Sequence, residues 1–302
     1  MHEGRPHATL GERWGCSRRV ISGGLGADMP TRPLPRDVWA VGAAYEAYVG
    51  RWSELVAREF VRWLGVPPHR RWVDVGCGAG ALARAIVELA APETVVAVDR
   101  SKGFVTHARA GAGDPRVAFH VGDAHWLAVP SSRFDVAVSG LVLNFVADPG
   151  KMVSEMARVG RPGATVGLYV WDYASGVELM RRFWDAATRL DPAAAALDEA
   201  VRFPGCAPAP LAALLGAAGL SDVETRAIDV PTHFRDFDDY WSPFLGGQGP
   251  APAYAMSLSE DRRVALREAI RASLPVASDG SIALTARAWA VRGSKAHVTA
   301  PP

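Results

Sequence analysis

A glycine-rich turn between two apolar segments is the first feature of the sequence that could do chemistry. Residues 73–80 read Val-Asp-Val-Gly-Cys-Gly-Ala-Gly, which describes a strand that runs into a Gly-x-Gly-x-Gly turn and then a helix. Glycine has no Cβ, so a ligand can approach the backbone of this turn closely, and the helix that follows offers free N–H groups. Asp99 ends the next apolar run, 19 residues after Gly80, where a carboxylate can accept hydrogen bonds from both hydroxyls of a ribose.

These residues alone fit two kinds of nucleotide site. The pattern Gly76-x-Gly78-x-x-Ala81 also satisfies the dinucleotide fingerprint of NAD(P)-dependent Rossmann oxidoreductases. Asp74 argues against a dinucleotide, because its negative charge lies two residues before the first glycine, close to where a pyrophosphate would sit. A cationic ligand is favoured there instead.

Two further motifs decide between these alternatives. Residues 122–124 (Gly-Asp-Ala) close a third apolar run, and residues 134–145 lead from a fourth run to Arg-Pro-Gly-Ala-Thr at 161–165. In this order and at this spacing, the motifs together resemble the class I S-adenosylmethionine-dependent methyltransferases. The chain looks most similar to the small-molecule type found in ubiquinone and menaquinone biosynthesis, over about residues 37–175 and more loosely to 292.

The resemblance implies an α/β fold with a doubly wound, Rossmann-like sheet of seven strands, mostly parallel with an antiparallel last strand, and helical insertions that cap the substrate. It also implies S-adenosyl-L-methionine as cofactor. The residues that it assigns to cofactor binding are Arg51, Asp74, Gly76, Gly78, Gly80, Asp99, Arg100, Asp123, Ala124 and Ser139.

By position in the family, Asp99 would hold the ribose hydroxyls, and Asp123 with Ala124 would meet the adenine. The three glycines would leave room for the methionine portion, with Ser139 nearby and Asp74 acting on its ammonium group directly or through water. An N-terminal segment with Tyr45, Tyr48 and Arg51 would cover the cofactor, and the planar guanidinium of Arg51 suits the methionine carboxylate.

The sequence identifies no catalytic residue. His125, His233 and Tyr173 are the candidates if the acceptor needs a base. Cys77 lies inside the glycine turn, where a packed small residue is favoured over a nucleophile. The histidines and cysteines show no metal-ligand spacing, so no metal is expected.

The elements that position these residues are strands that alternate with helices. This alternation indicates a parallel sheet, and such a sheet binds its ligand at the carboxyl ends of its strands. The sequence predicts strands at 71–76, 94–99, 117–123, 134–140, 164–171, 221–232 and 281–291. Ser101 and Asp148 are expected to cap helices, and residues 257–260 resemble a capping box before a helix that reaches Leu274.

The acceptor site is expected outside the nucleotide-binding core. We expect an extension over 1–36 that is disordered or loosely attached, and a methyltransferase domain over 37–292. Its cofactor core spans 70–173, its cap segments lie at about 175–205 and 235–275, and a tail follows from 293 to 302. Within the second cap segment, the aromatic and glycine-rich stretch 237–250 is expected to be a loop that covers the substrate with Trp241 and Phe244.

Composition limits the partners. The net charge of the 302 residues is +1, which excludes a field that gathers nucleic acid. No apolar run is long enough for a membrane span, and three widely spaced cysteines suit a reducing cytoplasm. The expected function is therefore methyl transfer to a small, partly hydrophobic organic acceptor, with a non-catalytic cofactor-binding partner protein as an alternative. The sequence does not predict the oligomeric state.

Overall fold

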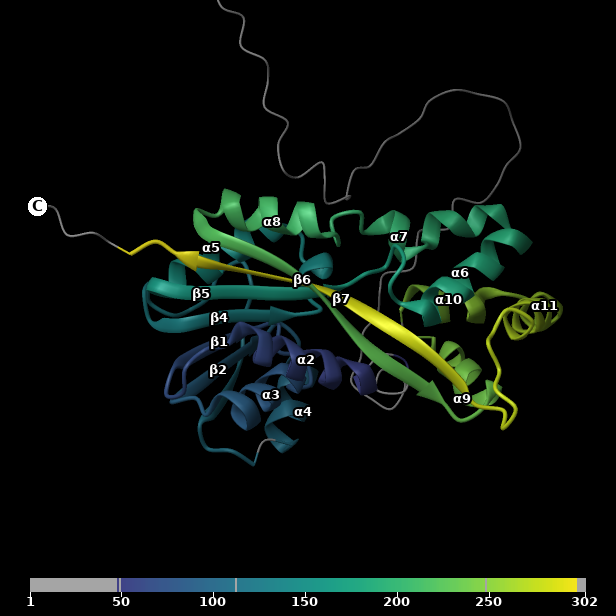
Figure 1. Cartoon of the computed structure of the whole chain (residues 1–302), viewed down its shortest axis with the longest axis horizontal. Helices are drawn as coiled ribbons and strands as arrows, with labels where there is room; N and C mark the ends of the chain where they lie inside the picture. The colour runs from purple at the N-terminus through teal and green to yellow at the C-terminus, as the bar shows by residue number, and fades with distance from the viewer. Residues whose placement is uncertain (1–47, 49, 112, 248, 298–302) are drawn as a thin grey trace, which may run out of the picture.

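The computed structural model describes residues 48, 50–111, 113–247 and 249–297 (Figure 1). The predicted N-terminal extension and Tyr45 lie outside these residues. The described residues form one sheet of seven strands in the order β3-β2-β1-β4-β5-β7-β6. Its strands are β1 (Arg71–Val75), β2 (Thr94–Asp99), β3 (Val117–Val121), β4 (Phe134–Gly140), β5 (Gly160–Trp171), β6 (Leu220–Phe234) and β7 (Ile282–Lys295).

The pairing of the strands confirms the predicted fold. Strands β1 to β5 pair in parallel, and β7 pairs antiparallel with both β5 and β6. The core residues of the central strands are fully buried on both faces, as in β1 at Trp72, Val73 and Val75. This is why these strands read as continuous apolar runs.

Helices cover both faces of the sheet. The α-helices are α2 (Arg51–Leu64), α3 (Ala81–Ala90), α4 (Lys102–Gly111), α5 (Pro149–Val159), α6 (Glu178–Leu190), α7 (Glu199–Arg202), α8 (Pro208–Ala217), α9 (Phe237–Trp241), α10 (Pro250–Ser257) and α11 (Glu260–Arg271). Three 3₁₀ turns join them among the described residues: η3 (Leu143–Phe145), η4 (Pro192–Leu197) and η5 (Ser242–Gly246).

The direction of the crossovers decides on which face of the sheet each helix lies. The connections from β1 to β3 and from β4 to β5 progress toward opposite edges of the sheet. Right-handed crossovers therefore place α3 and α4 on one face and α5 on the other. Helix α2 runs beside α3, held by the ion pairs Glu54–Arg84 and Arg58–Glu88, so the two helices begin side by side.

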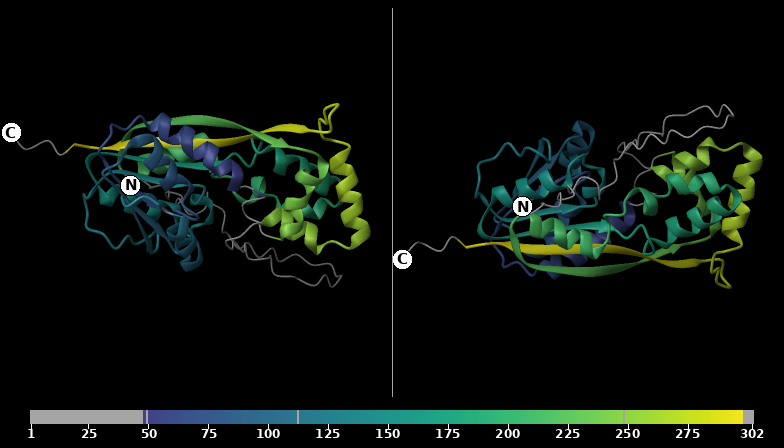
Figure 2. Two further views of the ribbon diagram at one scale, coloured as in Figure 1. Left: turned by 90° about the horizontal axis from the view of Figure 1, so that it is seen from below. Right: turned by 90° about the horizontal axis from the view of Figure 1, so that it is seen from above.

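A cap formed by residues 178–202 and 237–271 lies at the end of the molecule toward which the β6–β7 ribbon extends (Figures 1 and 2). It follows directly on the carboxyl end of β5. Rings fill its interior: Phe244 stacks on Phe183 with ring centroids 4.6 Å apart, and Phe183 meets Trp184 edge-on at 5.2 Å.

The structure corrects the expectation for residues 237–250. This stretch is largely helical, since α9, η5 and the start of α10 occupy its described part. Phe244 is fully buried and Trp241 is 5% exposed, so both rings belong to the core of the cap. Glycine and proline predicted a loop here because both are common in loops, but in this segment they separate short helices. Pro243 and Pro250 both occupy first-turn positions.

The structure tests the helix-start signals predicted at Ser101, at Asp148 and at residues 257–260. Ser101 accepts a hydrogen bond from the amide of Phe104 (3.3 Å), and Asp148 accepts one from Lys151 (2.9 Å), so both predicted caps are confirmed. The predicted capping box is wrong, because Ser257 ends α10, and Ser259, which directly precedes α11, makes no side-chain capping bond. The final strand begins one residue later than predicted and continues to Lys295.

Candidate functional site

The glycine turn connects β1 to α3 at the carboxyl edge of the sheet. Gly76, Gly78 and Gly80 all have positive φ, at 78°, 50° and 88°. A Cβ on Gly76 would lie 2.5 Å from Val142, and one on Gly80 would lie 3.3 Å from the Phe119 ring. A Cβ on Gly78 would meet nothing within 4 Å. Packing therefore requires the outer two glycines, while Gly78 borders open space.

Asp99 fixes the shape of this turn. One carboxylate oxygen accepts a hydrogen bond from the Gly78 amide at 2.9 Å, and the other accepts one from the Ser101 amide at 2.8 Å. A carboxylate has about four lone-pair positions, so Asp99 keeps acceptor capacity for a diol. The sequence placed Asp99 beside the turn but gave no sign of these two backbone bonds.

Asp74 is a buried carboxylate without a well-formed hydrogen bond. The side chain is 0% exposed, and neither oxygen meets a donor at full hydrogen-bonding geometry. Burial raises the pKa of this carboxyl to about 8, and the charge of Asp99 adds to the rise, while the nearby amide of Ala83 offsets part of it. Since an isolated buried carboxylate is unfavourable, this group suits a cationic ligand group.

Arg51, at the start of α2, carries the complementary charge. Its Nη1 lies 3.4 Å from Asp239, and its guanidinium lies over the rings of Trp52 and Phe234 at 4.6 and 4.9 Å. Its Nε and Nη2 are buried and have no acceptor among the residues that the structure describes. These two donors form one edge of the guanidinium, the edge that binds a carboxylate with two parallel hydrogen bonds.

Asp123 and His125 form a small loop after β3. One oxygen of Asp123 accepts from the His125 amide and contacts the imidazole Nδ1, each at 2.8 Å, and the first of these bonds is the main cause of a lowered pKa of Asp123. The His125 Nε2 accepts from the Asp148 amide at 3.2 Å. Both imidazole nitrogens are thus engaged, and His125 connects two loops. Ala124 is half-buried, and Arg100 is exposed and lowers the pKa of Asp123 further.

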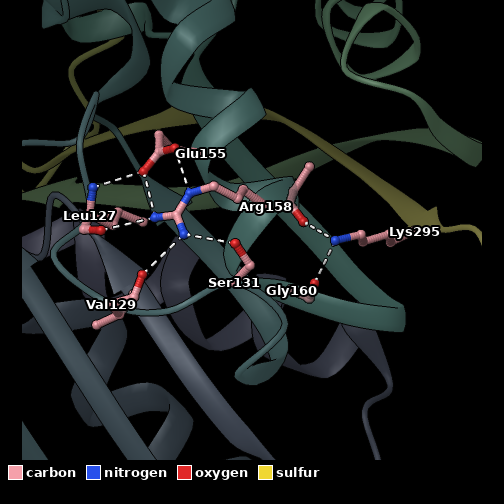
Figure 3. A network of polar contacts seen from close by, with 8 residues as sticks. Leu127, Val129, Ser131, Glu155, Arg158, Gly160 and Lys295 are labelled. Atoms are coloured by element: carbon pink, nitrogen blue, oxygen red, sulfur yellow. Dashed lines mark hydrogen bonds and ion pairs between the residues drawn. The ribbon is translucent and has the colours of Figure 1, made fainter.

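A polar network holds the chain that follows this loop (Figure 3). The guanidinium of Arg158, on α5, donates to the carbonyls of Leu127 (2.9 Å) and Val129 (3.1 Å) and to the hydroxyl of Ser131 (3.1 Å). Glu155 pairs with Arg158 and accepts from the Leu127 amide at 2.9 Å. The sequence gave no signal for this network, because its acceptors are mostly backbone atoms.

We expect Arg158→Met to lower the free energy of unfolding by about 1.5–3 kcal/mol, because the partly buried carbonyl bonds of Leu127 and Val129 lose a charged donor. Its cofactor affinity should also fall, since the Asp123 loop loses its support on α5. Chemical denaturation and calorimetry would measure the two effects. The control is Arg62→Met, which removes an exposed pair with Glu59 and should change stability by less than about 1 kcal/mol. Equal effects for both variants would contradict the supporting role.

Other predicted site residues have clear surroundings. The Ser139 hydroxyl donates to the Val75 carbonyl at 2.7 Å and so connects β4 to β1. His233 is exposed on β6, on the face opposite the buried Thr232. Burial raises the pKa of the Cys77 thiol, which suits a packed small residue and not a nucleophile.

Tyr173 lies at the carboxyl edge, just beyond β5. Its hydroxyl accepts a hydrogen bond from the side-chain amide of Asn144 at 3.3 Å, and its ring lies 5.4 Å from that of Phe203. Tyr173 thus contacts residues on η3 and just after α7. Asn144 was missed in the sequence, because one asparagine in an apolar run carries no distinctive spacing.

Two absences concern the described ranges. They hold no group of three or more His, Cys, Asp or Glu residues that could bind a metal ion. Within the same ranges, every helix is too short or too polar to cross a bilayer.

Comparisons with known proteins bear on this arrangement. Residues 73–168 match the family described as "Methyltransferase domain". The chain is 34% identical over 103 residues to the probable tocopherol O-methyltransferase of Oryza sativa subsp. japonica, covering 33% of this chain and 28% of that protein. It is 30% identical over 116 residues to the 2-phytyl-1,4-naphtoquinone methyltransferase of Synechococcus elongatus, covering 37% and 50%. The chain thus spans half or less of the length of these relatives.

The fold also has a counterpart among solved structures. The YcgJ protein of Bacillus subtilis superposes with a TM-score of 0.53 at 18% identity, covering 80% of this chain and 99% of that chain. At this identity the likeness concerns the fold alone. It supports the seven-stranded arrangement observed here.

Proposed function

The chain carries a class I S-adenosylmethionine-dependent methyltransferase domain, and from this premise we propose that it transfers a methyl group from S-adenosylmethionine to a small, partly hydrophobic organic acceptor. The main support comes from two sets of buried atoms that have no well-formed hydrogen bond among the described residues. They are the carboxylate oxygens of Asp74, on the strand that enters the glycine turn, and the Nε–Nη2 edge of Arg51, at the start of the helix that runs beside α3. This pair of charges is complementary to the ammonium and carboxylate groups of a methionine.

The remaining roles follow from position. Asp99 keeps lone pairs for the ribose hydroxyls while two amides hold it in place. Asp123 and Ala124 would receive the adenine on the loop that Arg158 supports. Gly78 would face the methionine portion, because it alone of the three glycines borders open space. A dinucleotide would place its pyrophosphate against the buried Asp74, which disfavours the oxidoreductase alternative.

S-adenosylmethionine supplies an activated methyl group on a sulfonium sulfur. The acceptor attacks the methyl carbon in line with the C–S bond. The protein contributes mainly alignment and the exclusion of water, and such positioning supplies about 7–11 kcal/mol of a barrier. The cap follows the carboxyl end of β5, and one of its interior rings, Phe244, lies 5.6 Å from the ring of Tyr48, which precedes α2.

The acceptor class draws support from two sides. The named relatives act on tocopherol and on a phytyl-naphthoquinone, both small and largely apolar. The net charge of +1 does not favour a nucleic acid. A cytoplasmic location is also part of the proposal, supported by the three widely spaced cysteines, of which Cys77 and Cys206 are free and buried.

We expect the purified chain to bind S-adenosylmethionine and not NAD in calorimetry. Asp99→Ala should weaken that binding on the order of a hundredfold or more, because two hydrogen bonds to a charged acceptor are lost. Its melting temperature must be measured too, since Asp99 also holds the turn. Unchanged affinity in a folded variant would refute the ribose assignment. Release of S-adenosylhomocysteine with an acceptor would exclude the non-catalytic alternative.

A further inference from the structure

Oxygen and nitrogen groups gather where the cap meets the carboxyl edge of the sheet. Tyr48 precedes α2, Asn144 lies on η3, Tyr173 follows β5 and Glu199 begins α7. The hydrogen bond between Asn144 and Tyr173 joins two of these segments. Burial is the main cause of the raised pKa of Tyr48, and the charges of Glu199 and of Tyr173 add to it, so both groups lie within electrostatic reach of Tyr48.

Two atoms of this cluster lack partners. The Tyr48 hydroxyl is buried in a side chain only 1% exposed and makes no hydrogen bond within the described residues. The side-chain oxygen of Asn144 is also buried and unpaired. Buried polar atoms in native proteins normally have a partner. Tyr173 bonds to Asn144 and lies within electrostatic reach of Tyr48, so the two atoms without a partner among the described residues point to a ligand with one polar group.

Glu199 is the ionisable group of the cluster. Its side chain is 2% exposed, and its Oε2 accepts a hydrogen bond from the Trp184 indole. Burial raises the pKa of Glu199 to about 7; the Trp184 bond and the charge of Arg202 lower it, and the charge of Asp198 raises it. Arg181, on α6, pairs with Asp198, and its charge lowers the pKa of Tyr48.

Aromatic rings surround these groups. Phe203 lies 5.8 Å from Phe145 and 5.4 Å from Tyr173, and Phe244 lies 5.6 Å from Tyr48. Flat apolar walls around one donor, one acceptor and one carboxylate suit an aromatic ring that carries a hydroxyl group.

We propose that the acceptor is a phenol or a comparably acidic enol, that Tyr48 and Asn144 orient its hydroxyl, and that Glu199 takes its proton. This inference rests on the proposed function and names its substrate class. In the reaction the hydroxyl O–H bond breaks and its proton passes to the Glu199 carboxylate. The oxygen forms a bond to the methyl carbon, and the electron pair of the broken C–S bond remains on sulfur.

The choice of acceptor follows from acidity. A phenol has a pKa of about 10, within reach of a carboxylate that titrates near neutrality, whereas an alkyl alcohol is far less acidic. The test therefore uses 4-methoxyphenol as the probe and 4-methoxybenzyl alcohol as its non-acidic counterpart, with S-adenosylhomocysteine release as the readout. We expect turnover of the phenol alone.

A pair of tyrosine variants tests the orienting role. Tyr48→Phe should leave the unfolding midpoint unchanged or higher, because the hydroxyl has no hydrogen-bond partner in the described part of the chain. It should raise the KM for the phenol about tenfold. Tyr240→Phe is the matched control: its buried hydroxyl donates to the Leu179 carbonyl at 3.0 Å, so the variant should lose stability and keep its KM. The reverse pattern would overturn the assignment.

The pH profile tests the base. Glu199→Gln should lower kcat at least a hundredfold and abolish the acid limb of the kcat profile, with S-adenosylmethionine affinity unchanged. Trp184→Phe should move that limb to higher pH, because it removes a hydrogen bond that lowers the pKa of Glu199. A structural role alone would change stability and leave the limb in place.

The outcomes of these experiments distinguish a failure of the phenol assignment from a failure of the proposed function. If the chain does not bind S-adenosylmethionine, the proposed function fails. Suppose that it binds the cofactor but turns over the alcohol as readily as the phenol, or turns over neither compound. In either case the phenol assignment fails and the proposed function stands. Wild-type profiles in Glu199→Gln also overturn the inference alone.

Discussion

Asp74→Asn is expected to stabilise the ligand-free protein above neutral pH while it weakens the binding of S-adenosylmethionine. Burial raises the pKa of Asp74 in the folded protein to about 8, far above its ordinary value of 3.8, so the folded protein holds this proton more tightly than the unfolded chain. Wild-type stability from this group is present below pH 4 and is lost as pH rises through 8, by up to about 5 kcal/mol. Denaturation at pH 5 and pH 9 should show a much larger gain for the variant at the higher pH, because only a small part of the loss has occurred at pH 5.

Affinity should move in the opposite direction. Loss of a charged partner for the ammonium group is expected to weaken binding by about tenfold to a hundredfold. Asp135→Asn is the matched control, since Asp135 is also buried but accepts from the Arg71 amide at 2.7 Å and pairs with Arg161 at 2.6 Å. This control should lose stability and keep its cofactor affinity. A variant at Asp74 that gains nothing at pH 9 would show that the carboxylate has a partner in solution.

Phe244→Ala is expected to lower the free energy of unfolding by about 3–5 kcal/mol, the usual cost of truncating a buried phenylalanine. The ring is fully buried, stacks on Phe183 and contacts Tyr240 and Trp241 at 5.8 Å. Urea denaturation measures the loss. Leu245→Ala is the control, because its side chain is 44% exposed and its truncation should change stability by less than about 0.5 kcal/mol. A small loss of stability for Phe244→Ala, together with a raised KM for the acceptor, would instead support the predicted loop that covers the substrate.

The nucleotide-binding half of the fold was predictable because each of its elements carries a local signal. Strand β4 was predicted at its observed bounds, since Phe134 to Gly140 is apolar and closes on glycine. The antiparallel position of β7 came from the family resemblance and is confirmed by its pairing with β5 and β6. No local pattern of residues 281–291 indicates which strands they join.

The cap was harder to predict because its helices are short and are set by tertiary packing. Helix α9 has five residues, and α10 begins Pro-Ala-Pro, a sequence that propensity alone assigns to a loop. The same limit applies to the site. Asp74 and Asp99 stand in recognisable motifs, whereas Glu199 follows an alanine run and reads as a solvated acid until the fold buries it against Trp184.

The place of β7 in the sheet constrains how a nascent chain is completed. Residues 282–295 are translated after every other described strand, yet they lie between β5 and β6 and bond to both. Until they emerge from the ribosome, β5 presents an open edge and β6 has no neighbour among the described strands. A translational pause between residues 234 and 282 therefore leaves two unpaired strand edges exposed together, the state in which a chaperone would have most to protect.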